Sequence, residues 1–157
     1  MEQFFGTKHI AARPMTRLDY NIYRGWDLPA DEDGSDDGYL VEYMDGGKPN
    51  HPDHEGYISW SPKEQFENAY QPTGRMSFGH AIAALKEGKK VARAGWNGKG
   101  MWLVLVNSAS YDVGGRTLGP VNVEMLPWIG MKTAGGGFVP WLASQTDILI
   151  NDWMIVE

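Results

Sequence analysis

Apolar residues in the second half of the chain follow first a helical and then a strand spacing. Phe78, Ile82 and Leu85 are four and three residues apart, which predicts one apolar face of a helix. Ser77 before this face and Gly88 after it are residue types that begin and end helices. Short apolar runs then predict strands at 89–93, 101–106, 128–133, 138–141 and 153–156. A helix followed by mostly antiparallel strands indicates an α+β fold.

The first half of the chain predicts a second, smaller set of helices and strands. Thr16 can cap a short helix in which Asp19 is the third residue, with Leu18 and Ile22 on one face. Runs bounded by turn residues predict strands at 39–44 and 56–60.

A further helix is predicted directly after the second of these strands. Ser61 is a capping residue, Pro62 suits a first helical turn, and Glu64 completes the spacing of a capping box. Phe66 and Tyr70 are four residues apart, so we expect them to pack this helix against the strands.

Charge divides the 157-residue chain into two parts. The net charge is −6, but residues 1–75 carry 7 basic and 14 acidic side chains, whereas residues 76–157 carry 7 and 6. The composition changes at 71–75, a short stretch containing Pro and Gly, so we expect two domains, 1–73 and 74–157. The acidic total argues against a DNA or RNA polymer as partner. The near-neutral second part still permits one small anionic ligand.

Cysteine is absent, which excludes disulfides, thiolate metal ligands and cysteine nucleophiles. The longest uninterrupted apolar run, at 101–106, is too short to span a bilayer. No charged-then-apolar leader opens the chain. We therefore expect a cytoplasmic protein that has no membrane partner.

Two segments of the first half contain residue types that bind metals. The acidic loop at 27–38 fits the first half of a calcium-binding EF-hand from Asp33 onward, but Met44 stands where a bidentate glutamate is required. His51 and His54 offer two imidazoles, with a proline between them and no third ligand in evident range. Solvated loops are the better interpretation of both segments, so we expect no metal and no cofactor.

Residues for acid–base catalysis are few in the second half. His80 lies three residues past a helix cap, and the acidic residues form no obvious pair. The glycines at 135–137 lie between two predicted strands, which favours a hairpin turn over a phosphate-binding loop. We therefore predict no catalytic residues, although a nucleotide hydrolase that recruits Asp147 or Asp152 as base remains an alternative.

The turn around Trp96 combines an aromatic ring with polar and cationic groups. Trp96 lies between two glycines, Arg93 precedes it, and Asn97 and Lys99 follow it. An indole face, an amide and two cations can hold an adenine ring and a phosphate. The alternative is that Trp96 only fills a corner of the core.

A second candidate cluster follows Trp141. Ser144 and Asp147 have the spacing of a capping box for one or two helical turns, and Thr146 adds a hydroxyl. The hydroxyls and the free N–H groups of a helix start can bind an anion or a ribose, or they can cap one another.

Long motifs in the second half resemble the phage-encoded Thoeris anti-defence 2 family. The stretches MSFGHAIAALKEGKKVARAGWNGKGMWLVL and MKTAGGGFVPWLASQTDILINDWMIV carry the resemblance over about residues 76–157. Within them, ARAGWNGKGM, PWLASQTD and NDW occur in the family's order. The resemblance implies a non-enzymatic protein that binds cyclic ADP-ribose-type signals and keeps them from their effector. Some members of this family also sequester cyclic oligonucleotides at a separate site.

The resemblance also implies an assembly and a set of ligand-contacting residues. Family members form homotetramers with pockets at subunit interfaces, so we expect a homo-oligomer, a tetramer or a dimer. Trp96 corresponds to the purine-stacking aromatic residue, and Arg93, Asn97 and residues 144–147 correspond to the lining of the pocket.

The first half of the chain departs from the compact pattern of the family. DGYLVEYMDGG and GYISWSPKEQFENAY resemble a small module that phage proteins place ahead of this domain. Taken together, we expect an anti-defence protein that sequesters its ligand in the cytoplasm of an infected bacterium. A structural or interaction module without a nucleotide ligand is the second alternative, and the hydrolase is the third.

Overall fold

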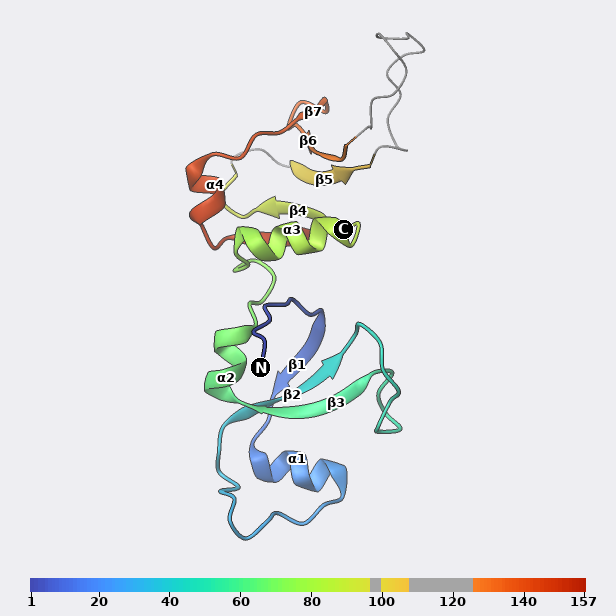
Figure 1. Ribbon diagram of the computed structural model, residues 1–157, viewed down its shortest axis with the longest axis vertical. Helices are drawn as coiled ribbons and strands as arrows, with labels where there is room; N and C mark the ends of the chain where they lie inside the picture. The colour runs from blue at the N-terminus through green and yellow to red at the C-terminus, as the bar shows by residue number, and fades with distance from the viewer. Residues whose placement is uncertain (97–99, 108–125) are drawn as a thin grey trace. The chain divides into compact units, whose positions relative to one another are not determined.

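The computed structural model describes residues 1–96, 100–107 and 126–157 of the chain. It divides into two compact units, Met1–Gln71 and Pro72–Glu157, which we call unit 1 and unit 2. Each unit combines short helices with one antiparallel sheet (Figure 1). The predicted α+β class is therefore confirmed.

Unit 1 contains a three-stranded antiparallel sheet. Its strands lie in the order β1 (Ile10–Pro14), β2 (Gly38–Tyr43) and β3 (Tyr57–Pro62). Leu40 of β2 pairs with Trp60 of β3, and the next pair on the same face includes Ile58. Because side chains alternate along a strand, these three face one side of the sheet and Tyr39 faces the other.

Helix α1 (Arg17–Arg24) packs on the Leu40 face of this sheet. Thr16 caps it as predicted, since its hydroxyl accepts a hydrogen bond from the Asp19 N–H at 3.1 Å. Tyr20 is the buried residue that packs against the sheet in the core of unit 1. Leu18 and Ile22, which the sequence placed on one face of this helix, are exposed.

Helix α2 (Lys63–Ala69) contacts the opposite face of the same sheet. Its Phe66 ring stacks on Tyr39 with a distance of 4.0 Å between ring centroids, and it also meets Tyr70 at 5.0 Å. The prediction that Phe66 and Tyr70 bring this helix to the strands is therefore confirmed.

The predicted start of α2 is wrong. Ser61 and Pro62 belong to β3, where they pair with Tyr39 and Gly38, and Pro62 at the helix boundary provides no side-chain cap. Strand pairing therefore continues through the residues that a capping motif would have used. The sequence also missed β1, an edge strand that is almost fully exposed and so lacks an alternating apolar pattern.

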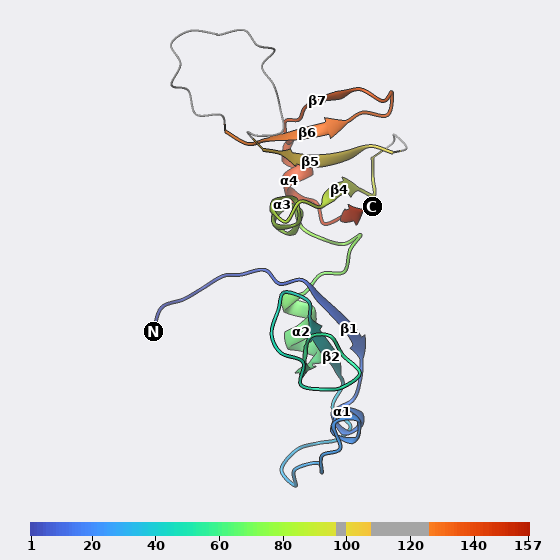
Figure 2. The same ribbon diagram turned by 90° about the vertical axis from the view of Figure 1, so that its right-hand side faces the viewer.

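Unit 2 contains a five-stranded antiparallel sheet, and Figure 2 shows its strands β7, β6, β5 and β4 one above another. The strands lie in the order β7 (Phe138–Pro140), β6 (Trp128–Lys132), β5 (Trp102–Val106), β4 (Lys90–Arg93) and β8 (Trp153–Val156). All five occur within two residues of the bounds predicted from the sequence. β8, the last strand in the chain, pairs with β4, which is the first strand of unit 2 in the sequence.

Helix α3 (Phe78–Lys86) covers one face of the unit 2 sheet. Ser77 caps it as predicted, and Gly88 follows its end with a φ of +81°, a conformation that suits glycine. Ala81 and Ala84 are buried between the helix and the sheet, and these small side chains allow a close approach.

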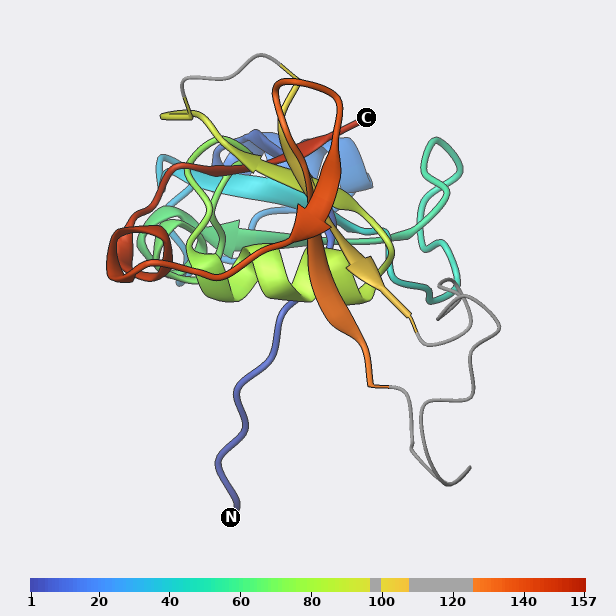
Figure 3. The ribbon, with the colours of Figure 1, turned by 90° about the horizontal axis from the view of Figure 1, so that it is seen from above.

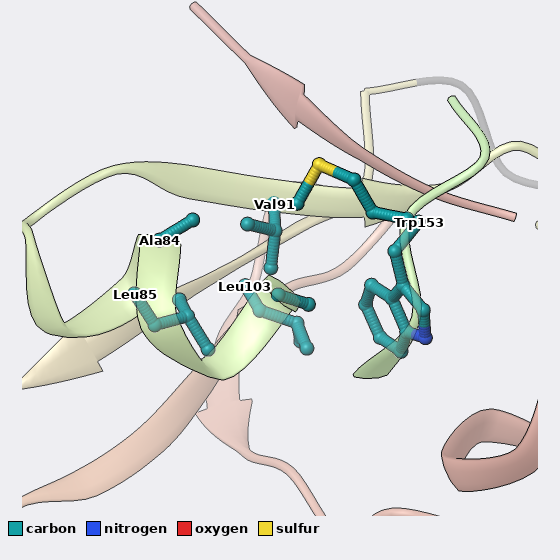
Figure 4. Packing of buried hydrophobic residues seen from close by; sticks show 7 residues of the cluster. Ala84, Leu85, Val91, Leu103 and Trp153 are labelled. Carbon is teal, nitrogen blue, oxygen red and sulfur yellow. The ribbon is translucent and has the colours of Figure 1, made fainter. Parts of the chain in front are cut away.

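The core of unit 2 lies between α3 and this sheet face. Ala84 and Leu85 from the helix lie with Val91, Leu103 and Trp153 from the strands (Figure 4). Leu85, Val91, Leu103 and Trp153 are at most 1% exposed. Fully burying one such side chain contributes about 1.5 to 3 kcal/mol, so this cluster is the main source of stability in the unit.

Helix α4 (Gln145–Leu149) lies beyond one end of the strands, near the start of α3 (Figures 1 and 3). Its predicted capping box is confirmed, because Ser144 and Asp147 exchange both of the expected hydrogen bonds.

Candidate functional site

The candidate site is assembled where β4 ends and β8 begins. Arg93, the last residue of β4, pairs with Trp153, the first residue of β8. Asp152 is the residue directly before Trp153, so this register places Asp152 beside Arg93. We call the group formed by Arg93, Trp96, Trp141, Asp147, Asp152 and Trp153 the tryptophan corner.

Two carboxylates bind the guanidinium of Arg93. Its Nε donates to Oδ1 of Asp152 at 2.9 Å, and its Nη1 donates to Oδ1 of Asp147 at 2.6 Å. All three side chains are largely shielded from solvent. The exposed fraction of the side chain is 12% for Arg93 and Asp147 and 22% for Asp152. The hydrogen bonds that Arg93 donates to Asp152, and then to Asp147, raise the pKa of Arg93, although burial acts to lower it.

Asp147 is held by the start of its own helix as well as by Arg93. Its Oδ2 accepts hydrogen bonds from the Ser144 N–H at 2.9 Å and the Ser144 hydroxyl at 2.7 Å. Burial alone would raise the pKa of Asp147, but the hydrogen bonds from Ser144 and Arg93 outweigh burial and lower it. The carboxylate therefore stays ionised and makes a poor proton donor.

Asp152 fixes the turn that leads to Trp96. Its Oδ2 accepts a hydrogen bond from the Gly95 N–H at 3.2 Å, and its carbonyl accepts one from the Ala94 N–H at 3.0 Å. A Cβ at position 95 would lie 2.9 Å from the same carboxylate oxygen, so glycine permits this close approach.

Three tryptophans meet edge to face at the corner. The centroid of Trp96 lies 5.7 Å from Trp153 and 6.4 Å from Trp141, and the last two are 6.0 Å apart. Trp153 is fully buried, and its indole N–H donates to the carbonyl of Asp147 at 2.9 Å. Trp96 and Trp141 are half-buried, so each has one part in the core and another part accessible.

The structure brings together most of the residues that the sequence singled out. Arg93, Trp96, Trp141, Ser144 and Asp147 are all within the tryptophan corner or its helix cap. Thr146 is exposed on α4 in the same region, whereas Asn97 and Lys99 lie outside the described residues.

Two parts of the corner were not predicted as site residues. Asp152 was considered only as the base of a hydrolase, and Trp153 only as part of a strand. The tripeptide NDW in the family motif contained both, but only the pairing of β4 with β8 shows that they support Arg93.

Arg93 was expected to offer its charge to a ligand. In the structure that charge is already matched by two carboxylates, so Arg93 positions the turn and α4 relative to each other. A cation for an anionic ligand would have to come from outside the corner, and the sequence's candidate, Lys99, lies outside the described residues.

Metal-binding groups considered in unit 1 have other partners. Both ring nitrogens of His54 are engaged, one with the Tyr23 hydroxyl at 2.9 Å and one with Glu42 at 2.6 Å. In the acidic loop, Asp33 accepts hydrogen bonds from the N–H and hydroxyl of Ser35. Within residues 1–96, 100–107 and 126–157, no group of three or more His, Cys, Asp or Glu is arranged to hold a metal.

Comparison with known proteins covers the unit that carries the corner. The family model of the Thoeris anti-defense 2-like domain matches residues 76–156, just over half of the chain. The chain belongs to the Thoeris anti-defense 2-like family. A relative named Thoeris anti-defense 2, from Bacillus phage SP01, is 41% identical over 89 residues. That alignment covers 53% of this chain and 97% of the relative.

The Thoeris anti-defense 2-like domain contains the whole tryptophan corner, whereas all of unit 1 lies outside the residues that the family model matches. Membership in this family supports a role as a phage anti-defence protein. Among the helices of the described residues, none is long and apolar enough to cross a membrane.

Proposed function

We propose that this protein binds a cyclic ADP-ribose-type immune signal and keeps it from its effector without degrading it. The observation that carries the proposal is membership of the Thoeris anti-defense 2-like family over residues 76–156, the same residues that build the tryptophan corner. The name of the phage relative, Thoeris anti-defense 2, supports the anti-defence part of this role.

The chemistry of the corner suits a purine-containing ligand. An aromatic ring that is anchored on one side and accessible on the other is a stacking surface for a flat base. Trp96 meets this description, because its contacts with Trp141 and Trp153 hold it in place while it stays half-exposed. Thr146 lies on α4 and Ser144 caps the start of this helix, and we assign the hydroxyls of both residues to polar contacts with the ligand.

The carboxylates of the corner support binding without turnover. Asp147 and Asp152 are the groups that a hydrolase would need as general bases, but both accept hydrogen bonds from Arg93. Asp147 also accepts two from Ser144, which leaves its lone pairs occupied and its basicity reduced. These contacts favour a structural role for both residues.

We propose further that the protein acts in the cytoplasm of the infected bacterium as a homo-oligomer, a tetramer or a dimer. In such an assembly a neighbouring subunit completes the pocket beside Trp96. Cyclic oligonucleotides are the second ligand class that we propose to test. Light scattering after size-exclusion chromatography measures the assembly directly, and a monomer at micromolar concentration would contradict this part of the proposal.

Titration calorimetry with cyclic ADP-ribose isomers tests the main proposal. We expect Trp96→Ala to weaken binding by about 5- to 150-fold, because base stacking on an aromatic side chain is worth about 1 to 3 kcal/mol. The matched control is Phe5→Ala, which removes an exposed aromatic side chain from unit 1. Equal losses in the two variants, or no loss in either, would remove Trp96 from the site.

A second measurement separates sequestration from catalysis. After incubation, the complex is denatured by heat and the released ligand is weighed by mass spectrometry. We expect the mass of the added signal, whereas a cleaved or hydrated product would support the hydrolase instead.

A further inference from the structure

Unit 1 contains a hollow that lies outside the residues matched by the family. It has a volume of about 770 Å³, within the range of about 300 to 1,000 Å³ that is usual for small-molecule sites. Helix α1, the segment after it and strand β3 line this hollow. The lining residues used below are Arg17, Arg24, Trp26, Asn50, Tyr57 and Trp60.

One wall is formed by the way in which α1 ends. Gly25 has a φ of +69°, and its N–H bonds back to the carbonyl of Ile22 in a helix-ending turn. The next residue, Trp26, donates its N–H to the carbonyl of Asn21 at 2.8 Å. This turn brings the Trp26 ring against the edge of Tyr20 at 6.2 Å while leaving 53% of Trp26 exposed.

The other wall is fixed by hydrogen bonds. The side-chain amide of Asn50 bonds to both backbone groups of Ile58, at 2.9 and 2.8 Å, as a neighbouring strand would. The indole N–H of Trp60 donates to the carbonyl of Met15 at 2.9 Å. Because these contacts already exist without a ligand, the aromatic walls are largely pre-formed.

Arg24 is a half-buried cation of this hollow, and no carboxylate among the described residues forms an ion pair with it. Nη1 of Arg24 is inaccessible to solvent and has no hydrogen-bond acceptor among the described residues. Its guanidinium lies over the Trp26 ring, 4.3 Å from the centroid. By contrast, the neighbouring Arg17 is bound by both carboxylate oxygens of Glu32. The Arg24 guanidinium also bonds to the hydroxyl of Tyr20, which carries no charge. Its positive charge is therefore not matched within the described residues, and the part of the guanidinium that faces the hollow can bind an external acceptor.

The charges around the hollow limit what that acceptor can be. Burial raises the pKa of Tyr20, so its hydroxyl stays neutral beside Arg24 and supplies no negative charge. Asp27 also lines the hollow, and the first half of the chain is strongly acidic. One unpaired cation in an acidic module suits a ligand with a single negative charge and disfavours a polyanion.

We propose that this hollow binds a flat aromatic carboxylate. The carboxylate accepts hydrogen bonds from Arg24, and the ring lies against the exposed faces of Trp26 and Tyr57. This is a second site, in unit 1, and it does not depend on the function proposed for the tryptophan corner.

Calorimetric titration of the full chain with three probes tests the charge assignment. Indole-3-acetate is expected to bind with one site per chain. Tryptamine has the same ring with the opposite charge and should bind at least tenfold more weakly. Phenyl phosphate is mostly dianionic at neutral pH and should also bind more weakly than the carboxylate. Tighter binding of either of these two probes, or no binding of indole-3-acetate at millimolar concentration, would overturn the proposal.

Matched variants test the location. Arg24→Gln should weaken indole-3-acetate binding at least tenfold, because a charge-assisted hydrogen bond is lost. Arg13→Gln removes the same charge from an exposed position of unit 1 that does not line the hollow, and should leave binding unchanged. Equal weakening by both variants would show a general charge effect and overturn the site.

Two further variants keep the test decisive. Trp26→Leu replaces an exposed ring and should also weaken binding, which provides an answer if Arg24→Gln fails to fold by circular dichroism. Trp96→Ala changes the other unit and should leave indole-3-acetate binding unchanged. A loss of binding in Trp96→Ala would place the probe at the tryptophan corner and overturn a site in unit 1.

Discussion

At the scale of single residues, Arg93 is the side chain that joins separate elements of the candidate site. It links the end of β4 to the start of β8 through Asp152 and to α4 through Asp147. Removing one partner from a shielded ion pair costs more than the pair contributes, because the remaining charge loses its solvation without compensation. Without Arg93, the carboxylates of Asp147 and Asp152 would both lose this ion pair while staying shielded from solvent.

We therefore expect Arg93→Met to lower the free energy of unfolding of unit 2 by about 2 to 3 kcal/mol. Lys89→Met is the control, because Lys89 is an exposed cation four residues away, and its replacement should change stability by less than about 0.5 kcal/mol. Urea denaturation followed by tryptophan fluorescence measures both. Equal effects of the two substitutions would contradict the bridging role.

The lowered pKa of Asp147 predicts a dependence of stability on pH. Its folded-state pKa lies below the value of about 3.9 for a free aspartate, so the unfolded state binds protons more readily. The stabilisation is fully present above that value and is lost as the pH falls through the folded-state pKa. We expect the stability difference between the wild type and Asp147→Asn to be largest near neutral pH and to shrink below about pH 4. A constant difference from pH 3 to pH 7 would contradict this.

At the scale of elements, backbone pairing decides where each strand begins and which residues it brings together. The turn before β3 shows this, since Gly56 lies against the last residues of β2. A Cβ at position 56 would lie 2.2 Å from the carbonyl oxygen of Tyr43. That oxygen belongs to the backbone of a paired strand, so it cannot move without disturbing the β2–β3 pairing.

We expect Gly56→Ala to destabilise unit 1 by about 1 to 3 kcal/mol, the usual cost of forcing an extra group into a packed region. Gly6→Ala is the matched control, because no heavy atom lies within 4 Å of the added group there. Thermal melts by circular dichroism compare the two. If Gly56→Ala melts at the wild-type temperature, the close approach is relieved by local adjustment.

Local signals predicted some elements and failed for others. The caps at Thr16, Ser77 and Ser144 were predicted correctly, because a side chain that bonds to a backbone N–H three residues later is a local event. Ser61 has the same signal but is used in β3, since pairing with β2 outweighs one capping bond. Local chemistry cannot show which of two such interactions is formed.

At the scale of the whole molecule, each unit has its own hydrophobic core. The core of unit 1 contains Tyr20, Leu40 and Ile58, whereas that of unit 2 contains residues from Met76 to Trp153. No residue belongs to both clusters in the described parts of the chain. Substitutions that share no partners usually have additive effects on stability.

We therefore expect the double variant Gly56→Ala/Arg93→Met to show the sum of the two single effects within about 0.5 kcal/mol. Scanning calorimetry of the four proteins also shows which transition each substitution shifts. Gly56→Ala should shift the transition of unit 1, and Arg93→Met that of unit 2. A coupling energy above about 1 kcal/mol would show that the units unfold together.

The amino-acid sequence by itself determined the α+β class, the five strands of unit 2, three helix caps and the candidates Trp96 and Trp141. These depend on spacing, capping chemistry and motifs that are local in the chain. Only the tertiary structure decided that Arg93 binds Asp147 and Asp152 and that Arg24 lines a hollow with no carboxylate partner among the described residues. Strand pairing and chain reversal bring together residues that are far apart in sequence, and the partners of a charge, more than its presence, determine what it can bind.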